Sequence, residues 1–289
     1  MAQPHQLTEE IDELHSLKQL IASYEEIASI RMRRTRESVL KNREFLREIS
    51  AVFDEVRSSY ADQIARLSRR RFGKNKVTFL AHNGKKVAVL LSAQTGLYGE
   101  IVSRSFNQFA QEVREGKSEV TIVGRHGLNL FVSEFPNHLY TFFELPDFGV
   151  SAEQLNEVVH HVVQYDEIHA YYGEFVSVVT QQPKKLTITA EISLEGSLVG
   201  HKVSYVFEPS LEKILMFFET EIFASLFNHT VKESQLAKFA SRVLALDQAD
   251  EKMQNRLKKL QFEHTRAVHW DLNKKQLNLL PAILGVMRR

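Results

Sequence analysis

The 289-residue chain contains no cysteine, which excludes disulfides, thiolate metal sites, iron–sulfur clusters and cysteine nucleophiles. It also lacks an excess of one charge, since 37 lysines and arginines nearly balance 36 aspartates and glutamates. A generic nucleic-acid binder would be strongly basic, so we expect no nucleic-acid partner. No apolar run approaches the roughly 20 residues of a membrane-spanning helix, and we expect no direct membrane span. The acidic N-terminus has no signal-peptide core, which favours a cytoplasmic location.

Glycine and proline are missing from two long stretches, residues 5–72 and 210–280. Eleven of the twelve glycines lie between Gly73 and Gly200. Inside a helix these residues cost about 1 kcal/mol for glycine and about 3 kcal/mol for proline. The distribution therefore predicts a long helix at each end of a globular domain. We expect the three parts to span residues 1–73, 74–208 and 209–289.

Apolar residues recur at alternating steps of three and four in both terminal stretches. The C-terminal series is Leu236, Phe239, Val243, Leu246, Met253, Leu257 and Leu260. The N-terminal series is Leu7, Ile11, Leu14, Leu17, Ile21 and Tyr24, and after a shift Val39, Leu46, Ile49, Phe53, Val56 and Tyr60. This spacing is typical of a coiled-coil seam. Because the two ends must return to each other, the sequence predicts one antiparallel coiled coil.

The middle of the chain alternates predicted strands and helices. Strands are expected over residues 86–92, 120–123, 139–145, 168–180 and 186–194, and helices over 101–113 and 152–164. Ser151 and Gln154 form a capping-box pattern at the start of the second helix. Strand–helix alternation favours a small, mostly parallel sheet with helices on its faces. The fold class is therefore α/β, a Rossmann-like central domain with a long coiled coil.

Catalytic motifs are lacking as well. Gly96 and Gly99 follow a predicted strand where a phosphate-binding loop would lie, but the dinucleotide fingerprint needs a third glycine. A tight structural turn is the better interpretation of this pair. His160, His161 and His169 lie near acids, yet they do not form a zinc-binding motif. We expect no catalytic residue, no cofactor and no metal.

Four arginines crowd six residues of the first predicted helix: Arg31, Arg33, Arg34 and Arg36. A solvated helix face is one interpretation. However, four arginines this close wrap most of a helix, and one slim neighbour cannot supply acids for all of them. The cluster therefore favours contact with an acidic partner. At the other end of the chain, residues 277–287 are largely apolar, which fits either a frayed tail or an apolar tip.

Several local strings, in this order, resemble the gamma subunit of F-type ATP synthases, the central rotor stalk. Residues 27–34 look like the second half of the family's first-helix pattern, which ends in paired arginines. Residues 92–100 are similar to its Ser-Asp-Arg-Gly-Leu-Cys-Gly-Gly turn, and residues 120–131 and 165–183 resemble segments that follow. Arg266 falls on the arginine of the family's last-helix motif, whose other polar identities mostly differ here. The resemblance covers nearly the whole chain.

The resemblance implies a non-catalytic rotor that transmits torque between the membrane c-ring and the catalytic hexamer of alpha and beta subunits. It also implies an epsilon subunit as a partner and a peripheral position on the cytoplasmic face of the bacterial cell membrane. The implied contacts with beta are Arg31, Arg33, Arg34, Arg36, Arg266 and Leu277. The implied apolar bearing tip is Leu279, Leu280, Ile283 and Leu284.

Two other interpretations remain open at this point. One is an α/β binding or scaffold module on a coiled-coil tether. The other is a rotor-like subunit of a related ATPase with a role other than ATP synthesis.

Overall fold

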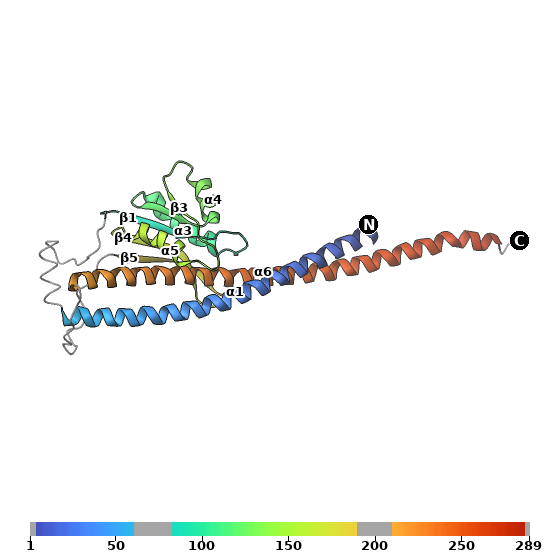
Figure 1. Cartoon of the computed structure of the whole chain (residues 1–289). Coiled ribbons are helices and arrows are strands. Elements are labelled where there is room, and N and C mark those ends of the chain that lie inside the picture. Colours follow the sequence, from blue (N-terminus) through green and yellow to red (C-terminus); the bar gives the residue numbers. More distant parts are fainter. Residues whose placement is uncertain (1–3, 61–82, 190–209, 287–289) are drawn as a thin grey trace. The chain divides into compact units, whose positions relative to one another are not determined.

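The computed structural model describes residues 4–60, 83–189 and 210–286, with side chains of the last helix described as far as residue 279 (Figure 1). The elements in chain order are α1 (Pro4–Ser59), β1 (Lys86–Leu91), α3 (Ile101–Glu115), β2 (Glu119–Val123), α4 (Arg125–Glu134), β3 (Thr141–Phe143), α5 (Ala152–Val162), β4 (Glu167–Phe175), β5 (Gln181–Thr189) and α6 (Leu211–Val286). The long helix expected at each end is confirmed, with 56 residues in α1 and 76 in α6. The expected boundaries at 73–74 and 208–209 lie outside the described residues.

The chain divides into two compact units. One unit comprises residues 1–28 and 243–289, which are the ends of α1 and α6. The other comprises residues 29–242 and contains the sheet together with the remaining parts of both helices.

The sheet of the second unit has five strands in the order β3-β2-β1-β4-β5. The first four are parallel, and β5 pairs antiparallel with β4. The mostly parallel sheet is thus confirmed, but the strand expected over 168–180 was too long. The chain turns after Phe175, where the Ser177 N–H donates to the Thr180 carbonyl at 2.9 Å, and β5 begins at Gln181. The apolar run 176–179 looks like strand in sequence but lies in this turn.

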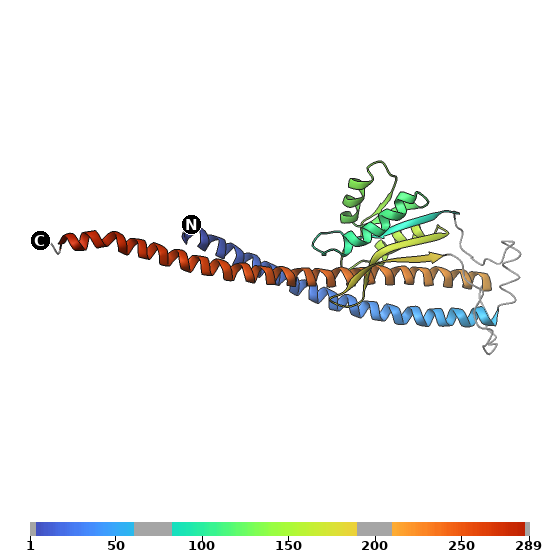
Figure 2. The ribbon, with the colours of Figure 1, turned by 180° about the vertical axis from the view of Figure 1, so that it is seen from behind.

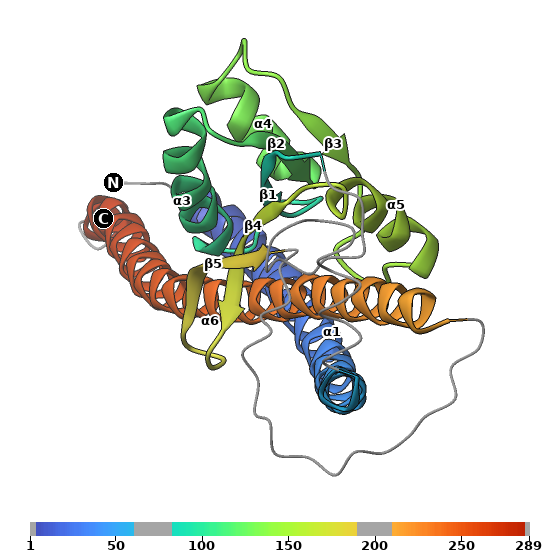
Figure 3. The ribbon, with the colours of Figure 1, turned by 90° about the vertical axis from the view of Figure 1, so that its left-hand side faces the viewer.

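Helices cover both faces of the sheet, as Figure 2 and Figure 3 show from two further sides. Because side chains alternate along a strand, β1 sends Val87 and Val89 to one face and Leu90 to the other. Val87 and Val89 pack with α5 and with Phe227 of α6. Leu90 packs with Phe109 of α3 and with α4. Helix α6 is therefore part of the core of the α/β domain and not an appendage to it.

The capping box expected at α5 is confirmed. The Gln154 N–H donates to the Ser151 hydroxyl, and the Ser151 N–H donates to the Gln154 side-chain carbonyl, both at 3.2 Å. Two otherwise unpaired donors at the helix start are satisfied in this way.

In the second unit α1 packs antiparallel against α6. The Phe53 and Phe218 rings lie 5.7 Å apart, and the Asn42 amide donates to the Ser225 carbonyl at 3.1 Å. Contacts therefore run in reverse order along the two helices. Further along, Met32 packs against the apolar cluster that contains Tyr98, Ile101 and Phe239.

In the first unit the remaining parts of α1 and α6 also run antiparallel. The Thr8 hydroxyl and the His264 ring nitrogen lie 3.2 Å apart, and Arg256 donates to Glu10 at 2.7 Å. Leu7 and Ile21 of α1 are buried, as are Leu257 and Leu260 of α6.

The seam of α1 differs from its predicted form. Leu17 and Tyr24 are exposed, whereas Ala28 and Thr35 are buried. The positions turned inward keep one register of three- and four-residue steps without a shift: Leu7, Ile11, Leu14, Lys18, Ile21, Glu25, Ala28, Met32, Thr35, Val39, Asn42, Leu46, Ile49, Phe53, Val56 and Tyr60. The expected shift was wrong because polar residues occupy several seam positions and hide the register from an apolar count.

Replacement of Gly124 by alanine tests how closely the sheet is packed. Gly124 has φ +99°, and an added Cβ would lie 2.7 Å from the Ala93 carbonyl oxygen. We expect Gly124→Ala to lower the free energy of unfolding by about 2 kcal/mol or more, measured by urea titration. Gly96→Ala is the matched control, since nothing lies within 4 Å of its Cβ position, and it should leave stability unchanged or slightly raised. Equal effects of the two changes would contradict the packing.

Candidate functional site

The turn between β1 and α3, residues 92–100, is held by one carboxylate. Asp147 accepts hydrogen bonds from the backbone N–H of Gln94 at 2.9 Å and of Thr95 at 3.0 Å, and from the Thr95 hydroxyl at 2.9 Å. Gly99 adopts a left-handed φ of 58°, and Leu97 a φ of 65° with 71% of its surface exposed. A leucine in this conformation is uncommon and persists only where its surroundings hold it.

A row of polar side chains on α6 binds this turn and the neighbouring residues Leu91 and Pro146, and we call the row the polar ladder. Its members are Ser234, Gln235, Lys238 and Arg242. Because 234, 238 and 242 are four residues apart, they lie on one face of the helix. Ser234 donates to the Leu91 carbonyl at 3.4 Å, and Gln235 donates to the Pro146 carbonyl at 3.3 Å.

The last two members of the ladder make its shortest bonds. Lys238 donates to the Ser92 carbonyl at 2.6 Å. Arg242 donates from Nε to the Leu97 carbonyl at 3.0 Å and from Nη2 to the Gly96 carbonyl at 2.7 Å. Its guanidinium also lies 3.8 Å from the centroid of the Tyr98 ring, a cation–π contact.

Lys238 and Asp147 form a buried ion pair. Their charged groups lie 3.5 Å apart, and each side chain is only 8% exposed. Burial lowers the pKa of Lys238, and the Asp147 charge opposes that change without cancelling it. Burial alone would raise the pKa of Asp147, but Lys238 and the hydrogen bonds from Gln94 and Thr95 hold it below its ordinary value. Each charge therefore depends on the other for its place in the core.

The four clustered arginines of α1 are not equivalent. The Arg31 guanidinium lies 5.5 Å from the centroid of the Phe148 ring and packs against the α/β domain. Arg33, Arg34 and Arg36 are exposed. In the part of the chain that the structure describes, none of these four arginines forms an ion pair. Three guanidinium groups thus remain available on one short segment of α1.

The final part of α6 carries exposed apolar side chains. Trp270, Leu272, Leu277 and Leu279 are each half exposed or more. Arg266 is exposed too. The side chains of Leu280, Ile283 and Leu284 lie outside the described residues. Contact with α1 is seen as far along α6 as His264.

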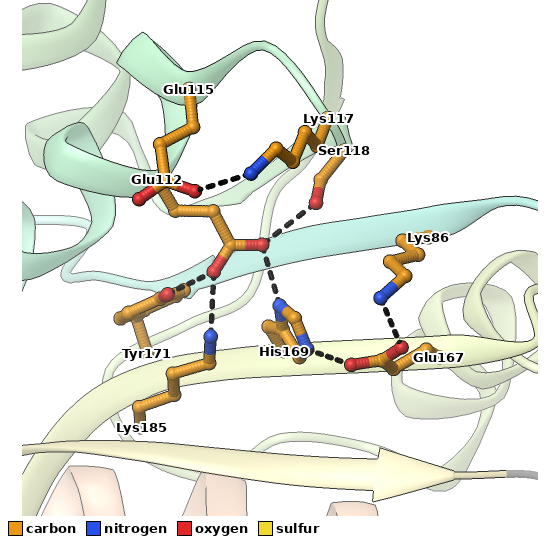
Figure 4. Close-up of polar contacts among 9 residues, drawn as sticks. All are labelled: Lys86, Glu112, Glu115, Lys117, Ser118, Glu167, His169, Tyr171 and Lys185. Atoms are coloured by element: carbon orange, nitrogen blue, oxygen red, sulfur yellow. Dashed lines mark hydrogen bonds and ion pairs between the residues drawn. The ribbon is translucent and has the colours of Figure 1, made fainter.

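A buried glutamate that sequence reasoning missed organises the other end of the sheet (Figure 4). Glu112 of α3 accepts hydrogen bonds from Tyr171, from Ser118 at 2.7 Å, from His169 at 2.5 Å and from Lys185 at 2.9 Å. These donors come from β4, β5 and the loop before β2. The sequence does carry a signal for this cluster: Glu112 places a charge on the apolar face of α3, between Phe109 and Val113.

His169 bridges two carboxylates in this cluster. Its Nδ1 lies 2.5 Å from Glu112, and its Nε2 lies 2.6 Å from Glu167. Lys86 pairs with the same Glu167 at 2.5 Å. The cluster borders a cavity of about 510 Å³. Burial alone would raise the pKa of Glu112, but its four hydrogen-bond donors outweigh burial and lower that pKa to about 2.

In the ranges 4–60, 83–189 and 210–286 no three His, Cys, Asp or Glu side chains are grouped to hold a metal ion. Within those ranges, no helix combines the length and the apolar character needed to cross a membrane.

The terminal helices pair antiparallel in each unit, and in the second unit the α/β domain packs on them. These features define a coiled-coil protein with a central α/β domain. Two solved structures share the fold. One comes from the central stalk and c-ring of the Tetrahymena thermophila mitochondrial ATP synthase, with a TM-score of 0.57 and 17% identity over 80% of this chain and 99% of that chain. The other comes from the Euglena gracilis mitochondrial ATP synthase, with a TM-score of 0.53 and 14% identity over 88% and 94%.

Sequence comparison identifies the family. The ATP synthase family model matches residues 3–267, and the chain belongs to that family. An ATP synthase gamma chain from Desulforamulus reducens is 24% identical over 279 residues, covering 92% of this chain and 93% of the relative. One from Symbiobacterium thermophilum is 25% identical over 261 residues, covering 87% of each. The resemblance found in the sequence is confirmed.

The Glu112 cluster predicts an acid-dependent stability. A carboxyl whose pKa falls from 4.5 to about 2 on folding stabilises the fold fully above about pH 4.5, by about 3 kcal/mol. That contribution is lost as the pH falls toward 2. We expect Glu112→Gln to be less stable at pH 7 and to show a shallower loss between pH 4.5 and 2, measured by urea unfolding across pH. Glu115→Gln, at an exposed neighbour, is the control and should follow the wild type. A Glu112→Gln profile parallel to that of the wild type would refute the assignment.

Proposed function

We propose that this chain is the central-stalk rotor subunit of an F-type ATP synthase. It transmits torque between the membrane c-ring and the catalytic hexamer of alpha and beta subunits, and it is itself non-catalytic. The observation that carries the proposal is the family match over residues 3–267, combined with antiparallel terminal helices that bear a mostly parallel α/β domain. Nucleotide chemistry belongs to the beta subunits.

A rotor must be stiff and asymmetric, and this chain has a physical source for each property. The buried seam between α1 and α6 resists bending, because bending would expose apolar surface. The two helices present different side chains around their circumference, so each catalytic interface meets a different face as the rotor turns. Such differential contact shifts each interface between its open and closed states.

The exposed arginines of α1 are suited to contacts that form and break at each step. We assign Arg31, Arg33, Arg34 and Arg36 to acidic loops of the beta subunits, and Arg33, Arg34 and Arg36 are exposed in the described structure. Exposed ion pairs contribute only about 0–1 kcal/mol each. Contacts this weak guide the rotor without trapping it.

The end of α6 is assigned to the sleeve formed by the alpha and beta subunits. Arg266 and Leu277 would contact beta, and Leu279, Leu280, Ile283 and Leu284 would form the apolar tip. The exposed Trp270, Leu272 and Leu277 support this assignment, since exposed apolar side chains favour a partner surface. An apolar tip turns with few hydrogen bonds to break.

The α/β domain is assigned to the membrane-proximal end. There it would dock the epsilon subunit and the c-ring, and the complex would be peripheral on the cytoplasmic face of the bacterial cell membrane. Torque would enter the chain through this domain and leave through the helices.

A tethered ligand-binding module is the second candidate, and the cavity beside Glu112 favours it. A small molecule held there would raise the melting temperature of the isolated chain, because binding to the folded state stabilises it. A melting temperature that stays unchanged across nucleotides and common metabolites would reject the ligand-binding module and favour the rotor.

Crosslinking tests the rotor assignment without background, because the chain has no cysteine. We expect Arg33→Cys and Leu277→Cys to form crosslinks with beta in the intact complex. Lys117→Cys, on the α/β domain, is the matched control and should not. The isolated chain should not hydrolyse ATP, and it should co-purify with alpha and beta subunits. Intrinsic ATP turnover, or crosslinks from the control site alone, would reject the assignment.

The arginine assignment predicts a loss of coupling without a loss of stability. Replacing Arg33, Arg34 and Arg36 together by glutamine removes exposed groups that form no ion pair in the described structure. The free energy of unfolding should therefore change by less than about 0.5 kcal/mol, while protons pumped per ATP hydrolysed should fall. Arg31→Gln is the comparison and should cost about 0.5–1 kcal/mol of stability, since it removes the stack on Phe148. Unchanged coupling in the triple variant would contradict the assignment.

A further inference from the structure

We propose that Lys238 and Arg242 form the torque-bearing joint between helix α6 and the α/β domain. The inference rests on the proposed function, in which torque enters through that domain and leaves along the helices. Among the described residues of the second unit, the domain meets the helices where it packs on α6 and α1. The question is which part of that contact resists rotation.

Apolar contacts are poorly suited to resist rotation. Phe227 and Val231 of α6 pack on the sheet, and this burial holds the helix against the domain. The hydrophobic effect is non-directional and depends on area, so a helix that rolls or slides while staying buried loses little. Hydrogen bonds weaken steeply when their angle falls below about 120°. Directional bonds therefore resist the twisting motion that apolar burial tolerates.

The polar ladder concentrates such bonds on one face of α6. Its four side chains reach the backbone carbonyls of Leu91, Ser92, Gly96, Leu97 and Pro146. Backbone acceptors cannot yield by changing a rotamer, as side-chain acceptors can. A roll of α6 about its axis would stretch all of these bonds together.

The turn that receives the ladder is fixed to the sheet, so a load on it is passed on. The Ser92 N–H donates to the Val123 carbonyl at 2.9 Å, and the His126 N–H donates to the Ala93 carbonyl at 2.8 Å. Gly124 lies so close to Ala93 that no side chain fits between them. Force on residues 92–97 thus reaches β1, the end of β2 and the start of α4.

Lys238 and Arg242 supply the two strongest links of the ladder. Displacing Lys238 would separate it from Asp147 inside the core, where an unpaired charge is strongly unfavourable. Arg242 holds two successive carbonyls with one planar group and covers Tyr98. Such a fork fixes an angle as well as a distance.

A single-molecule rotation assay tests the joint in the complete ATPase complex. The hexamer is fixed to a surface, and a bead is attached through Leu139→Cys on the α/β domain or through Leu40→Cys on α1, both exposed positions. The bead at residue 139 reports torque that has passed from the helices through the joint to the domain. The bead at residue 40 reports torque that is still carried by the helices. The variants are Arg242→Gln, Arg242→Lys, and Lys238→Gln combined with Asp147→Asn.

For Arg242→Gln we expect the torsional stiffness measured with the bead at residue 139 to fall at least twofold. The stiffness measured with the bead at residue 40 and the rate of ATP hydrolysis should stay unchanged. Arg242→Lys should give an intermediate value, and the Lys238/Asp147 double variant a fall similar to that of Arg242→Gln. Arg256→Gln is the matched control, since this α6 arginine pairs with Glu10 of α1, and it should match the wild type.

If both Arg242→Gln and the double variant keep the wild-type stiffness with the bead at residue 139, the proposal that Lys238 and Arg242 form the joint is wrong. A failed rotor assignment gives a different result, because the wild-type beads would then not rotate at either position.

Discussion

The packing of the second unit depends on one short stretch of α6 that is buried on all its sides. Residues 234–241 are all buried, because the sheet and the turn 92–100 lie against part of this helix and α1 lies against another part. Small side chains such as Ala237, Ala240 and Ser241 let these neighbours approach closely. The polar members Lys238 and Gln235 are tolerated there only because each finds an acceptor in the domain. Sheet, turn and coiled coil are therefore stabilised by the same eight residues.

Much of this architecture could be predicted from the sequence because it depends on local rules. The absence of glycine and proline marked both long helices, and alternation of strand and helix patterns indicated the mostly parallel sheet. Predictions failed where polar residues occupy buried positions and apolar residues occupy exposed ones. Lys18 and Glu25 occupy seam positions next to the exposed Leu17 and Tyr24, so the register of α1 looked interrupted. Val178 and Val179 lie in an exposed turn, so the first of the two predicted strands ran on to residue 180, and the second was placed at 186 although β5 begins at Gln181.

The candidate site was predictable only where residues cluster along the chain. Four arginines in six residues were visible at once, although the stacking of Arg31 on Phe148 was not. The contacts of the ladder join residues at least 89 positions apart in the sequence, and no spacing rule links them. The left-handed Leu97 is likewise invisible in sequence, because such conformations are expected at glycine. The assignment of function came from the order of the local strings, which the family match later confirmed.

The uninterrupted seven-residue repeat of α1 has a mechanical consequence. A straight α-helix has 3.6 residues per turn, so a seam that repeats every 3.5 residues drifts around the helix unless the pair coils to the left. A left-handed pair is wound tighter by twist in its own sense and is unwound by twist in the opposite sense. ATP synthesis and ATP hydrolysis turn a rotor in opposite senses. For a chain that works as the proposed rotor, we therefore expect the helix pair to resist twist more stiffly in one working direction than in the other.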